Sequence, residues 1–170
     1  MQADERPKIA ERITSARAKL LAAVEGLEAA AWEWRPGDGR WSVRLTLAHV
    51  GEAQWSHLEV ARRAVAGEPM ELPGFELDAW NAAAVAERAA WPVERVLADL
   101  DAAQEATLAF LEELDAGQLA VTESHPALGE ISIGQTLRII AVHDSMHRRD
   151  IVKLLEEMGE RTHRGETDRS

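Results

Sequence analysis

The chain has 170 residues, with 30 Asp and Glu against 19 Lys and Arg, and a formal net charge of −11. This length is typical of one domain that buries a substantial core. The absence of Cys excludes disulfides, thiolate zinc ligands and a cysteine nucleophile. The acidic balance excludes unaided binding to nucleic acid, which needs Lys and Arg to displace phosphate counterions, and it disfavours an anionic membrane surface.

The amino-terminal segment and the overall composition indicate a helical protein of the cytoplasm. Residues 1–19 are charged throughout and contain no apolar stretch of the kind that signal peptides have. No uncharged apolar run approaches the ~20 residues that a membrane span needs. Ala, Glu and Leu dominate, whereas Val, Ile and Thr are sparse, which favours helix over strand. We therefore expect a soluble, cytoplasmic, all-α protein.

The first half of the chain predicts two amphipathic helices. Apolar residues recur every three or four positions over residues 6–27, and Pro7 suits a first helical turn. Residues 36–39 read Pro-Gly-Asp-Gly, a strong turn signal. Ser42 then precedes a long apolar stripe over residues 43–66 and is the expected N-cap of that helix.

The second half predicts a short helix and two further long ones. After a loop at residues 67–77, Asp78 caps a short helix that ends at residue 90, before Trp91 and Pro92. A long helix follows over residues 92–114, with a stripe that includes Val93, Leu97, Leu100 and Gln104. Residues 121–131 suggest a short extended pair. Ser132 and Gln135 form a capping box for a helix over residues 133–158, which Gly159 ends.

Four long amphipathic helices predict a four-helix bundle with a short extra helix in the connection between the second and third. The chain reads as a single domain over residues 1–160, followed by a polar tail over residues 161–170. The periodicity leaves the up-down order of the helices open. The acidic, Ala-rich helices suggest a homodimer. The six Trp are expected to be packing residues for the most part, with an apolar wall around a site as the alternative.

The last helix carries polar residues in its apolar stripe. Asp144 and His147 occupy positions where a bundle favours Leu or Ile, and His143 lies one turn before His147 on the same flank. Side chains at this spacing are about 5–6 Å apart at Cβ, so both imidazoles can bind one divalent ion. Asp150 falls on the same flank and can orient an imidazole. The alternative is a flank of hydrogen-bonded histidines.

A third ligand has to come from another element. His49 and His57 both lie in the helix predicted over residues 43–66, while His125 lies in a loop and His163 in the tail. His57 is nearer the centre of the apolar stripe, so periodicity alone slightly favours it over His49. A histidine at the edge of the core is the alternative interpretation of His57.

Three segments together resemble the DinB/YfiT-like superfamily. Residues 41–49 match its Trp-Ser-x4-Leu-Ala-His string, residues 134–151 resemble its closing His-x3-His helix, and Asp-Ala-Trp-Asn at residues 78–81 is also similar. The resemblance covers about residues 6–158. It implies a four-helix bundle in which His49, His143 and His147 hold a divalent metal, zinc or nickel, and it replaces His57 by His49.

The resemblance also implies a class of reaction. The superfamily includes enzymes that transfer low-molecular-weight thiols such as bacillithiol or mycothiol, and others that isomerise maleylpyruvate with mycothiol. An open metal position would lower the pKa of a cosubstrate thiol. Arg44, Arg148 and Arg149 are candidates for contacting anionic groups of a small-molecule substrate, or else belong to a solvated face. The alternative is a non-catalytic, stress-related dimer with a vestigial or structural metal site; a metal store or sensor ranks below it.

Overall fold

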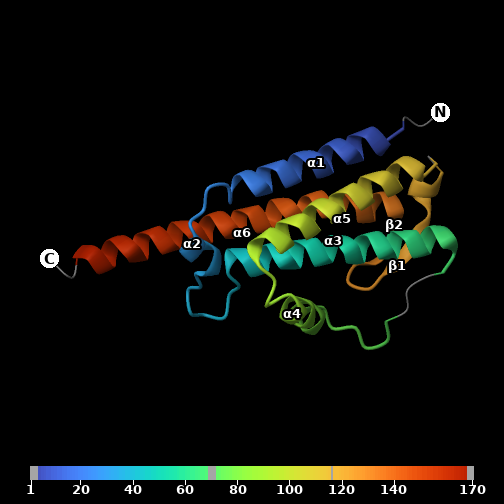
Figure 1. Ribbon diagram of the computed structural model, residues 1–170. Coiled ribbons are helices and arrows are strands. Elements are labelled where there is room, and N and C mark those ends of the chain that lie inside the picture. Colours follow the sequence, from blue (N-terminus) through green and yellow to red (C-terminus); the bar gives the residue numbers. More distant parts are fainter. Residues whose placement is uncertain (1–3, 69–71, 116, 168–170) are drawn as a thin grey trace.

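The computed structural model describes residues 4–68, 72–115 and 117–167 and consists mostly of helices. Four long helices form a bundle (Figure 1): α1 (Arg6–Ala22), α3 (Val43–Ala66), α5 (Val93–Glu113) and α6 (Ile133–Thr167). The predicted all-α four-helix bundle is therefore confirmed. Within the described residues, no helix combines the length and apolar character required to cross a membrane.

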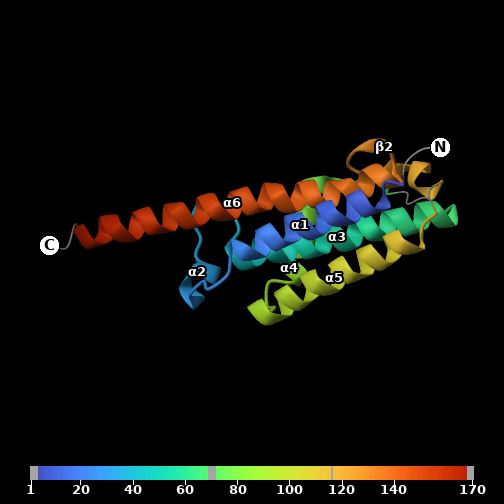
Figure 2. The same ribbon diagram turned by 90° about the horizontal axis from the view of Figure 1, so that it is seen from above.

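The four long helices form two parallel pairs, so the bundle is not a simple up-down-up-down arrangement of helical hairpins. α1 and α6 run in one direction, and α3 and α5 run in the opposite direction (Figures 1 and 2). α1 packs mainly on α6, and α3 packs on both α5 and α6. Because α3 and α5 are parallel, the connection between them has to cross the full length of the bundle. This crossover places a segment of chain over one face of α3.

Shorter elements fill the connections. α2 (Ala29–Glu33) lies between α1 and α3, and α4 (Leu77–Glu87) lies in the crossover, where the sequence predicts an extra short helix. The 3-10 helix η1 (Gln118–Ala120) leads into an antiparallel hairpin of β1 (Thr122–His125) and β2 (Gly129–Ser132). The predicted extended pair is therefore present, and its turn lies beside the middle of the bundle.

Two predicted helix caps are present in the structure. The Ser42 hydroxyl accepts a hydrogen bond from the Leu45 amide at 3.4 Å at the start of α3. At the start of α6, the Gln135 amide donates to the Ser132 hydroxyl at 3.2 Å, and the Ser132 amide donates to the Gln135 side chain at 2.8 Å. These reciprocal bonds satisfy amide groups that a helix start leaves without partners.

The ends of the first and last helices differ from the prediction. α1 ends at Ala22 rather than at residue 27, and Gly26 adopts a φ of 71° in the turn that follows. α6 does not stop at Gly159 but continues to Thr167. A glycine costs a helix only about 1 kcal/mol. Arg161 offsets this cost because it donates to Glu157 at 2.8 Å and to the Pro36 carbonyl at 3.0 Å.

The buried face of α5 is also rotated relative to the predicted stripe. Val96, Ala103 and Phe110 are buried, whereas Val93 and Gln104 are only partly covered. The prediction used only the spacing of apolar residues within this helix, whereas α5 contacts α3 far more extensively than α1. Its apolar residues therefore turn towards α3, and the short residues on that side, such as Ala103, allow close packing.

A buried polar network divides the core into two apolar clusters. One cluster includes Ile13, Leu58 and Leu137, and the other includes Leu20, Leu47 and Leu100. Between them the Arg17 guanidinium donates to the Asp144 carboxylate at 2.8 Å, to the Gln54 side chain at 2.6 Å and to the Leu100 carbonyl at 2.8 Å. The Gln54 amide donates in turn to Thr107 at 2.9 Å. Asp144, the polar residue in the apolar stripe, thus forms a core ion pair with Arg17, and the hydrogen-bond network around this pair joins all four long helices.

Candidate metal centre and substrate cavity

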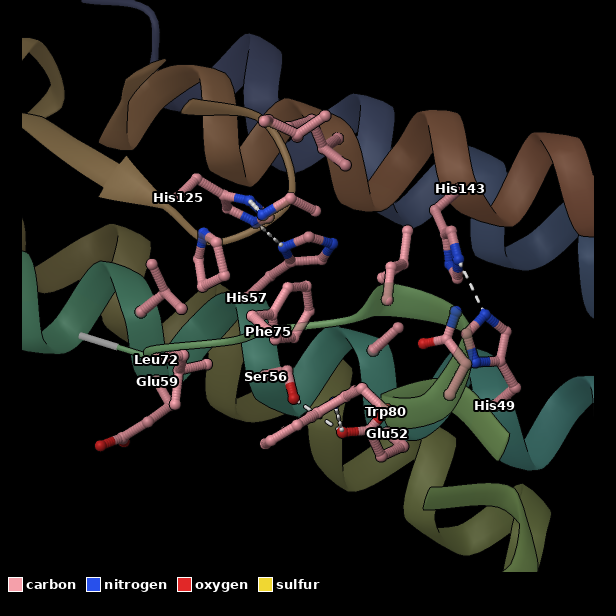
Figure 3. A pocket seen from close by; sticks show the side chains of 18 of the residues that line it. His49, Glu52, Ser56, His57, Glu59, Leu72, Phe75, Trp80, His125 and His143 are labelled. Atoms are coloured by element: carbon pink, nitrogen blue, oxygen red, sulfur yellow. Dashed lines mark hydrogen bonds between the residues drawn. The ribbon is translucent and has the colours of Figure 1, made fainter. Parts of the chain in front are cut away.

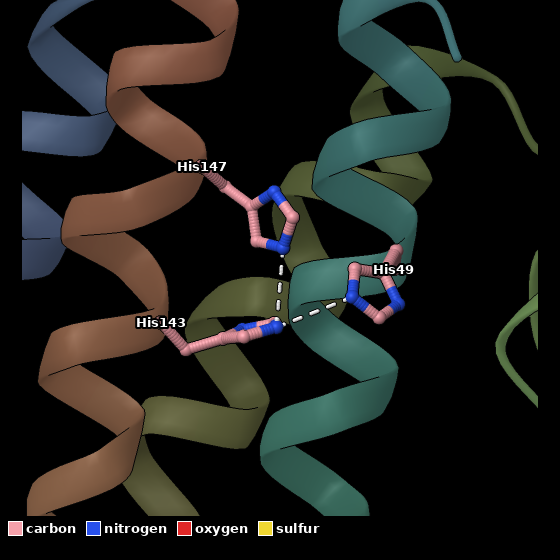
Figure 4. Close-up of side chains that lie close together, drawn as sticks. All are labelled: His49, His143 and His147. Atoms are coloured by element: carbon pink, nitrogen blue, oxygen red, sulfur yellow. Dashed lines mark hydrogen bonds between the residues drawn. The ribbon is translucent and has the colours of Figure 1, made fainter. Parts of the chain in front are cut away.

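Three histidines from two helices converge beside this network. His49 projects from α3, and His143 and His147 project from successive turns of α6 (Figure 4). The Nε2 atom of His143 lies 3.2 Å from Nε2 of His49 and 3.1 Å from Nε2 of His147. One nitrogen from each ring lies within 4.8 Å of the others, in a group that could hold a metal ion. The structure thus brings together the three residues that the family resemblance implies.

Hydrogen bonds alone do not account for this cluster. A neutral imidazole carries one proton. Nε2 of His143 can therefore donate a hydrogen bond to only one of its two neighbouring Nε2 atoms, and the other close contact has no hydrogen bond from it. Charging the rings is unfavourable, because burial lowers the pKa of His49 to about 4 and lowers the pKa of His143 further. Three converging lone pairs in a site that disfavours protons are the donor set of a divalent cation.

The outward-facing nitrogen of His147 fits the same interpretation, whereas that of His49 has no such partner in the described part of the chain. Nδ1 of His147 lies 3.3 Å from the Asp150 carboxylate, which favours a proton on Nδ1 and leaves Nε2 free as a ligand. Nδ1 of His49 is buried without a hydrogen-bond partner among the described residues. Trp41 packs against the His49 ring at 5.1 Å between centroids and restricts its orientation.

The three histidines lie at one side of a cavity of about 510 Å³. Figure 3 shows this cavity between α3, α6, the crossover and the hairpin turn. Its walls are mostly apolar, and their large apolar residues come from the segment before α3, the crossover, the hairpin turn and α6: Trp41, Leu72, Phe75, Leu77, Trp80, Leu128, Ile139 and Met146. Leu77, Trp80, Leu128 and Met146 are between 41% and 52% exposed, so an apolar rim surrounds the opening. Such a shape suits a small, largely apolar ligand.

Few polar groups line this cavity. Glu52 is 7% exposed, lies one turn after His49 on α3, and accepts hydrogen bonds from the Ser56 hydroxyl at 2.7 Å and the Trp80 indole at 3.4 Å. Glu59 also lines the cavity, but its side chain is exposed. No Lys or Arg belongs to the described lining. The described lining therefore supplies no fixed positive charge to the cavity.

A second pair of histidines lies in the same cavity. Nε2 of His125, at the end of β1, lies 3.0 Å from Nδ1 of His57 on α3. The Ala127 amide donates to the other ring nitrogen of His125 at 3.2 Å. Burial lowers the pKa of His57 to about 4 and also lowers that of His125, so both rings are neutral at pH 7. His57 therefore faces the cavity but does not join the three-histidine cluster.

A smaller cavity lies on the other side of His147. It has a volume of about 280 Å³ and shares Trp41 and His147 with the larger cavity. Arg40 and Lys153 line it, together with Asp150. Arg40 is already paired with Asp38 and with Glu157, each at 2.7 Å. The candidate centre is thus flanked by one apolar cavity and one charged cavity.

Helical periodicity alone does not place several of the cavity residues. Glu52 lies three positions after His49, on the same helical face, and this spacing is the one clue that could have identified it. Trp80 and His125 come from connections whose path periodicity does not define. Arg44, a predicted contact for anions, instead pairs with Glu33 and donates to the Ala89 and Trp91 carbonyls at 3.0 Å. The side chain of His163 lies outside the described residues.

Comparisons with known proteins agree with this geometry. The model of the DinB superfamily matches residues 12–151. A protein of Oceanobacillus iheyensis named "Putative metal-dependent hydrolase OB0413" is 24% identical over 110 residues, which are 65% of this chain and 62% of that protein. The chain thus spans less than two thirds of this relative's length.

Two solved structures share the fold. YfiT from Bacillus subtilis, described as a probable metal-dependent hydrolase with an unusual four-helix bundle topology, is 21% identical with a TM-score of 0.76. That alignment covers 94% of this chain and 90% of YfiT. The four-helix bundle protein TT2238 is 25% identical with a TM-score of 0.64, over 86% of this chain and 97% of that one.

Proposed function

The chain belongs to the DinB superfamily, and on that premise we propose that it is a metal-dependent enzyme acting on a small, largely apolar substrate. One observation carries the proposal: three Nε2 atoms converge at the side of an apolar cavity that a substrate can enter. His49, His143 and His147 would hold a divalent ion, zinc or nickel. Such an ion supplies a Lewis acid that lowers the pKa of a ligated water or thiol.

The first candidate reaction is hydrolysis of an ester or amide. The named relatives support it, since OB0413 and YfiT are both described as metal-dependent hydrolases. The cavity walls hold the apolar body of the substrate and exclude water from it. Glu52 is the carboxylate on the cavity side of α3 nearest in sequence to His49, and we assign it the transfer of a proton from the attacking water to the alcohol or amine that leaves when its bond to the carbonyl carbon breaks.

The second candidate is transfer of a low-molecular-weight thiol. The smaller cavity favours it, because Lys153 lines that cavity together with His147 and could receive a carboxylate of such a thiol. The electrophile would then occupy the apolar cavity on the opposite side of the centre. The absence of Cys from the chain means that the reactive sulfur would come from the cosubstrate.

Metal content tests the premise of both reactions. Protein purified without a His-tag should contain about one divalent ion per chain by elemental analysis. His147→Ala should lose most of it, since two imidazoles bind far more weakly than three. His57→Gln, which changes a cavity histidine outside the cluster, is the matched control and should retain the ion. An unsubstituted chain without metal, or equal metal in the parent and His147→Ala, contradicts the proposal.

Turnover distinguishes the two reactions. The parent is assayed with a panel of aryl esters and anilides, and with electrophiles plus thiols, before and after addition of metal. Turnover without any thiol supports hydrolysis, and turnover that requires a thiol supports transfer. Activity that survives His143→Ala contradicts a role for the centre. Metal binding without turnover in either panel favours the non-catalytic alternative.

We further propose a cytoplasmic homodimer without a nucleic-acid partner. The net charge of −11 supports the last point, because phosphate contacts require a basic surface. The exposed side chain of Val142 on α6, 65% accessible, is the most exposed large apolar group among the described residues and supports an apolar contact between copies.

A further inference from the structure

Two histidines outside the three-histidine cluster, His57 and His125, form an ordered chain of hydrogen bonds into the cavity. The chain starts at the Ala127 amide in the hairpin turn, passes through His125 at the end of β1, and reaches His57 on α3. Figure 3 shows that the second ring nitrogen of His57 faces away from His125, towards the part of the cavity where His143 lies. The ring centroids of His57 and His143 are 6.5 Å apart.

The backbone amide sets the proton positions along this chain. A backbone N–H can only donate, so Nδ1 of His125 has to accept and carries no proton. The single proton of neutral His125 is then on Nε2, which donates to Nδ1 of His57. Nδ1 of His57 is therefore the acceptor, and the proton of His57 is on Nε2. The result is a fixed N–H donor directed into a mostly apolar cavity.

The same reasoning excludes a second metal at this pair. A histidine that binds a metal through Nε2 carries its proton on Nδ1 and donates it to a neighbouring acceptor, as His147 can to Asp150. Nδ1 of His125 meets a donor instead of an acceptor. The short distance between His57 and His125 is thus a hydrogen bond, whereas the short distances within the three-histidine cluster are not all explained in this way.

We propose that His57 is a substrate-binding residue that donates a hydrogen bond from Nε2 to the carbonyl oxygen of an apolar ester, amide or ketone. The inference rests on the proposed function for its use of the cavity as the substrate site. A carbonyl group held there lies beside His143, and the apolar walls cover the rest of the molecule. His125 acts through His57 and is a positioning residue.

The proton positions are measured directly by long-range ¹H–¹⁵N NMR of the imidazoles. In chelator-treated parent protein we expect His57 and His125 each to carry a proton on Nε2 and a bare Nδ1. His125→Phe removes the donor to Nδ1 of His57 and should produce a mixture of the two neutral forms of His57. A proton on Nδ1 of His57 in the parent overturns the proposal.

Binding of a neutral probe tests the donor itself. The probe is 4-phenylbutan-2-one, an apolar ketone, titrated calorimetrically into metal-free and zinc-loaded protein. His57→Phe keeps an aromatic ring but removes the donor, and it should weaken binding about five-fold, the size expected for one neutral hydrogen bond. His57→Gln retains an N–H donor and should recover part of the loss. Glu105→Gln, a change at an exposed residue of α5 that does not line the cavity, should leave the affinity unchanged.

The outcomes separate this inference from the proposed function. Equal affinity of the parent and His57→Phe, or no binding of the ketone to the parent, overturns the inference even where the three-histidine centre holds metal. If the proton positions and ketone affinities are as expected but the chain binds no metal, the proposed function is wrong and the inference about His57 stands. If His57→Phe does not fold, the proton positions in the parent and the affinity of His57→Gln still decide.

Discussion

At the scale of single residues, the three imidazoles depend on what their outward nitrogens meet. His147 faces Asp150, whose carboxylate favours the ring form that leaves Nε2 free for a metal. Such outer partners typically change metal affinity by about 10–100-fold. Because Asp150 is largely exposed, its contribution belongs at the lower end of that range.

Replacement of Asp150 should therefore weaken metal binding without unfolding the chain. We expect Asp150→Ala to lower zinc affinity about ten-fold, measured by competition with a chromophoric chelator. Arg149→Ala removes an exposed neighbour on the same helix and is the matched control. Equal zinc affinities for the parent and Asp150→Ala would show that His147 needs no help from this carboxylate.

The residue scale also shows where sequence reasoning falls short. Periodicity favoured His57 as the third ligand, because it lies near the centre of the stripe of α3. The structure shows that both His49 and His57 face the same cavity, and that only His49 lies level with His143 and His147. A helical wheel gives direction around the axis but not which level of the next helix lies opposite. The string around His49 supplied that information through the family resemblance.

At the scale of elements, the ion pair of Arg17 and Asp144 fixes how the four long helices meet. Arg17 is 2% exposed and Asp144 is 1% exposed, and their partners come from α3 and α5. Removal of one member of a buried pair leaves an uncompensated charge, which costs about 3–5 kcal/mol. Asp144 lies between His143 and His147 in the chain, so the network also fixes the helix that carries two of the candidate ligands.

Loss of Arg17 should therefore be severely destabilising. We expect Arg17→Met to reduce the free energy of unfolding by about 3–5 kcal/mol in urea titrations followed by Trp fluorescence. Arg12→Met changes an exposed arginine on the same helix and should alter stability by less than about 0.5 kcal/mol. Arg17→Met combined with Asp144→Leu should regain part of the loss. A small effect of Arg17→Met alone would mean that the carboxylate of Asp144 is neutral in the core.

The helices themselves could be predicted better than their ends and rotations. Pro7, Ser42 and the box of Ser132 and Gln135 located three helix starts, because caps depend on a few adjacent residues. The end of α6 could not be located in this way, since Gly159 is outweighed by contacts of Arg161 with residues far away in sequence. The rotation of α5 similarly depends on its neighbours and not on its own pattern.

At the scale of the whole molecule, buried neutral histidines make stability depend on pH. The pKa of His49 and that of His57 fall to about 4 in the folded chain, against an ordinary value near 6.5. Between these values the unfolded chain binds more protons than the folded chain. The contribution of these two rings to the free energy of unfolding is therefore fully present above pH ~6.5 and is lost as the pH falls towards 4.

Metal-free protein should consequently be less stable at pH 5 than at pH 7.5. Each of the two rings contributes on the order of 2 kcal/mol to this loss at pH 5, measured by urea titration at both values. His57→Gln should lose the contribution of one ring, on the order of 2 kcal/mol at pH 5, whereas His49, His125 and His143, whose pKa values burial also lowers, retain the rest of the pH dependence. A parent chain equally stable at both pH values would contradict the burial of neutral rings.

The cavity combines parts of different structural origin. Two bundle helices, α3 and α6, carry the three-histidine cluster, and the polar network of the core fixes α6 at Asp144. Phe75 in the crossover, Trp80 on α4 and Leu128 in the hairpin turn line the rest of the cavity, and none of them belongs to the four long helices of the bundle. The covering segments can therefore accept insertions and replacements that the bundle cannot. The residues that contact a substrate in the crossover and the hairpin turn can thus change in sequence while the three histidines on α3 and α6 stay in place.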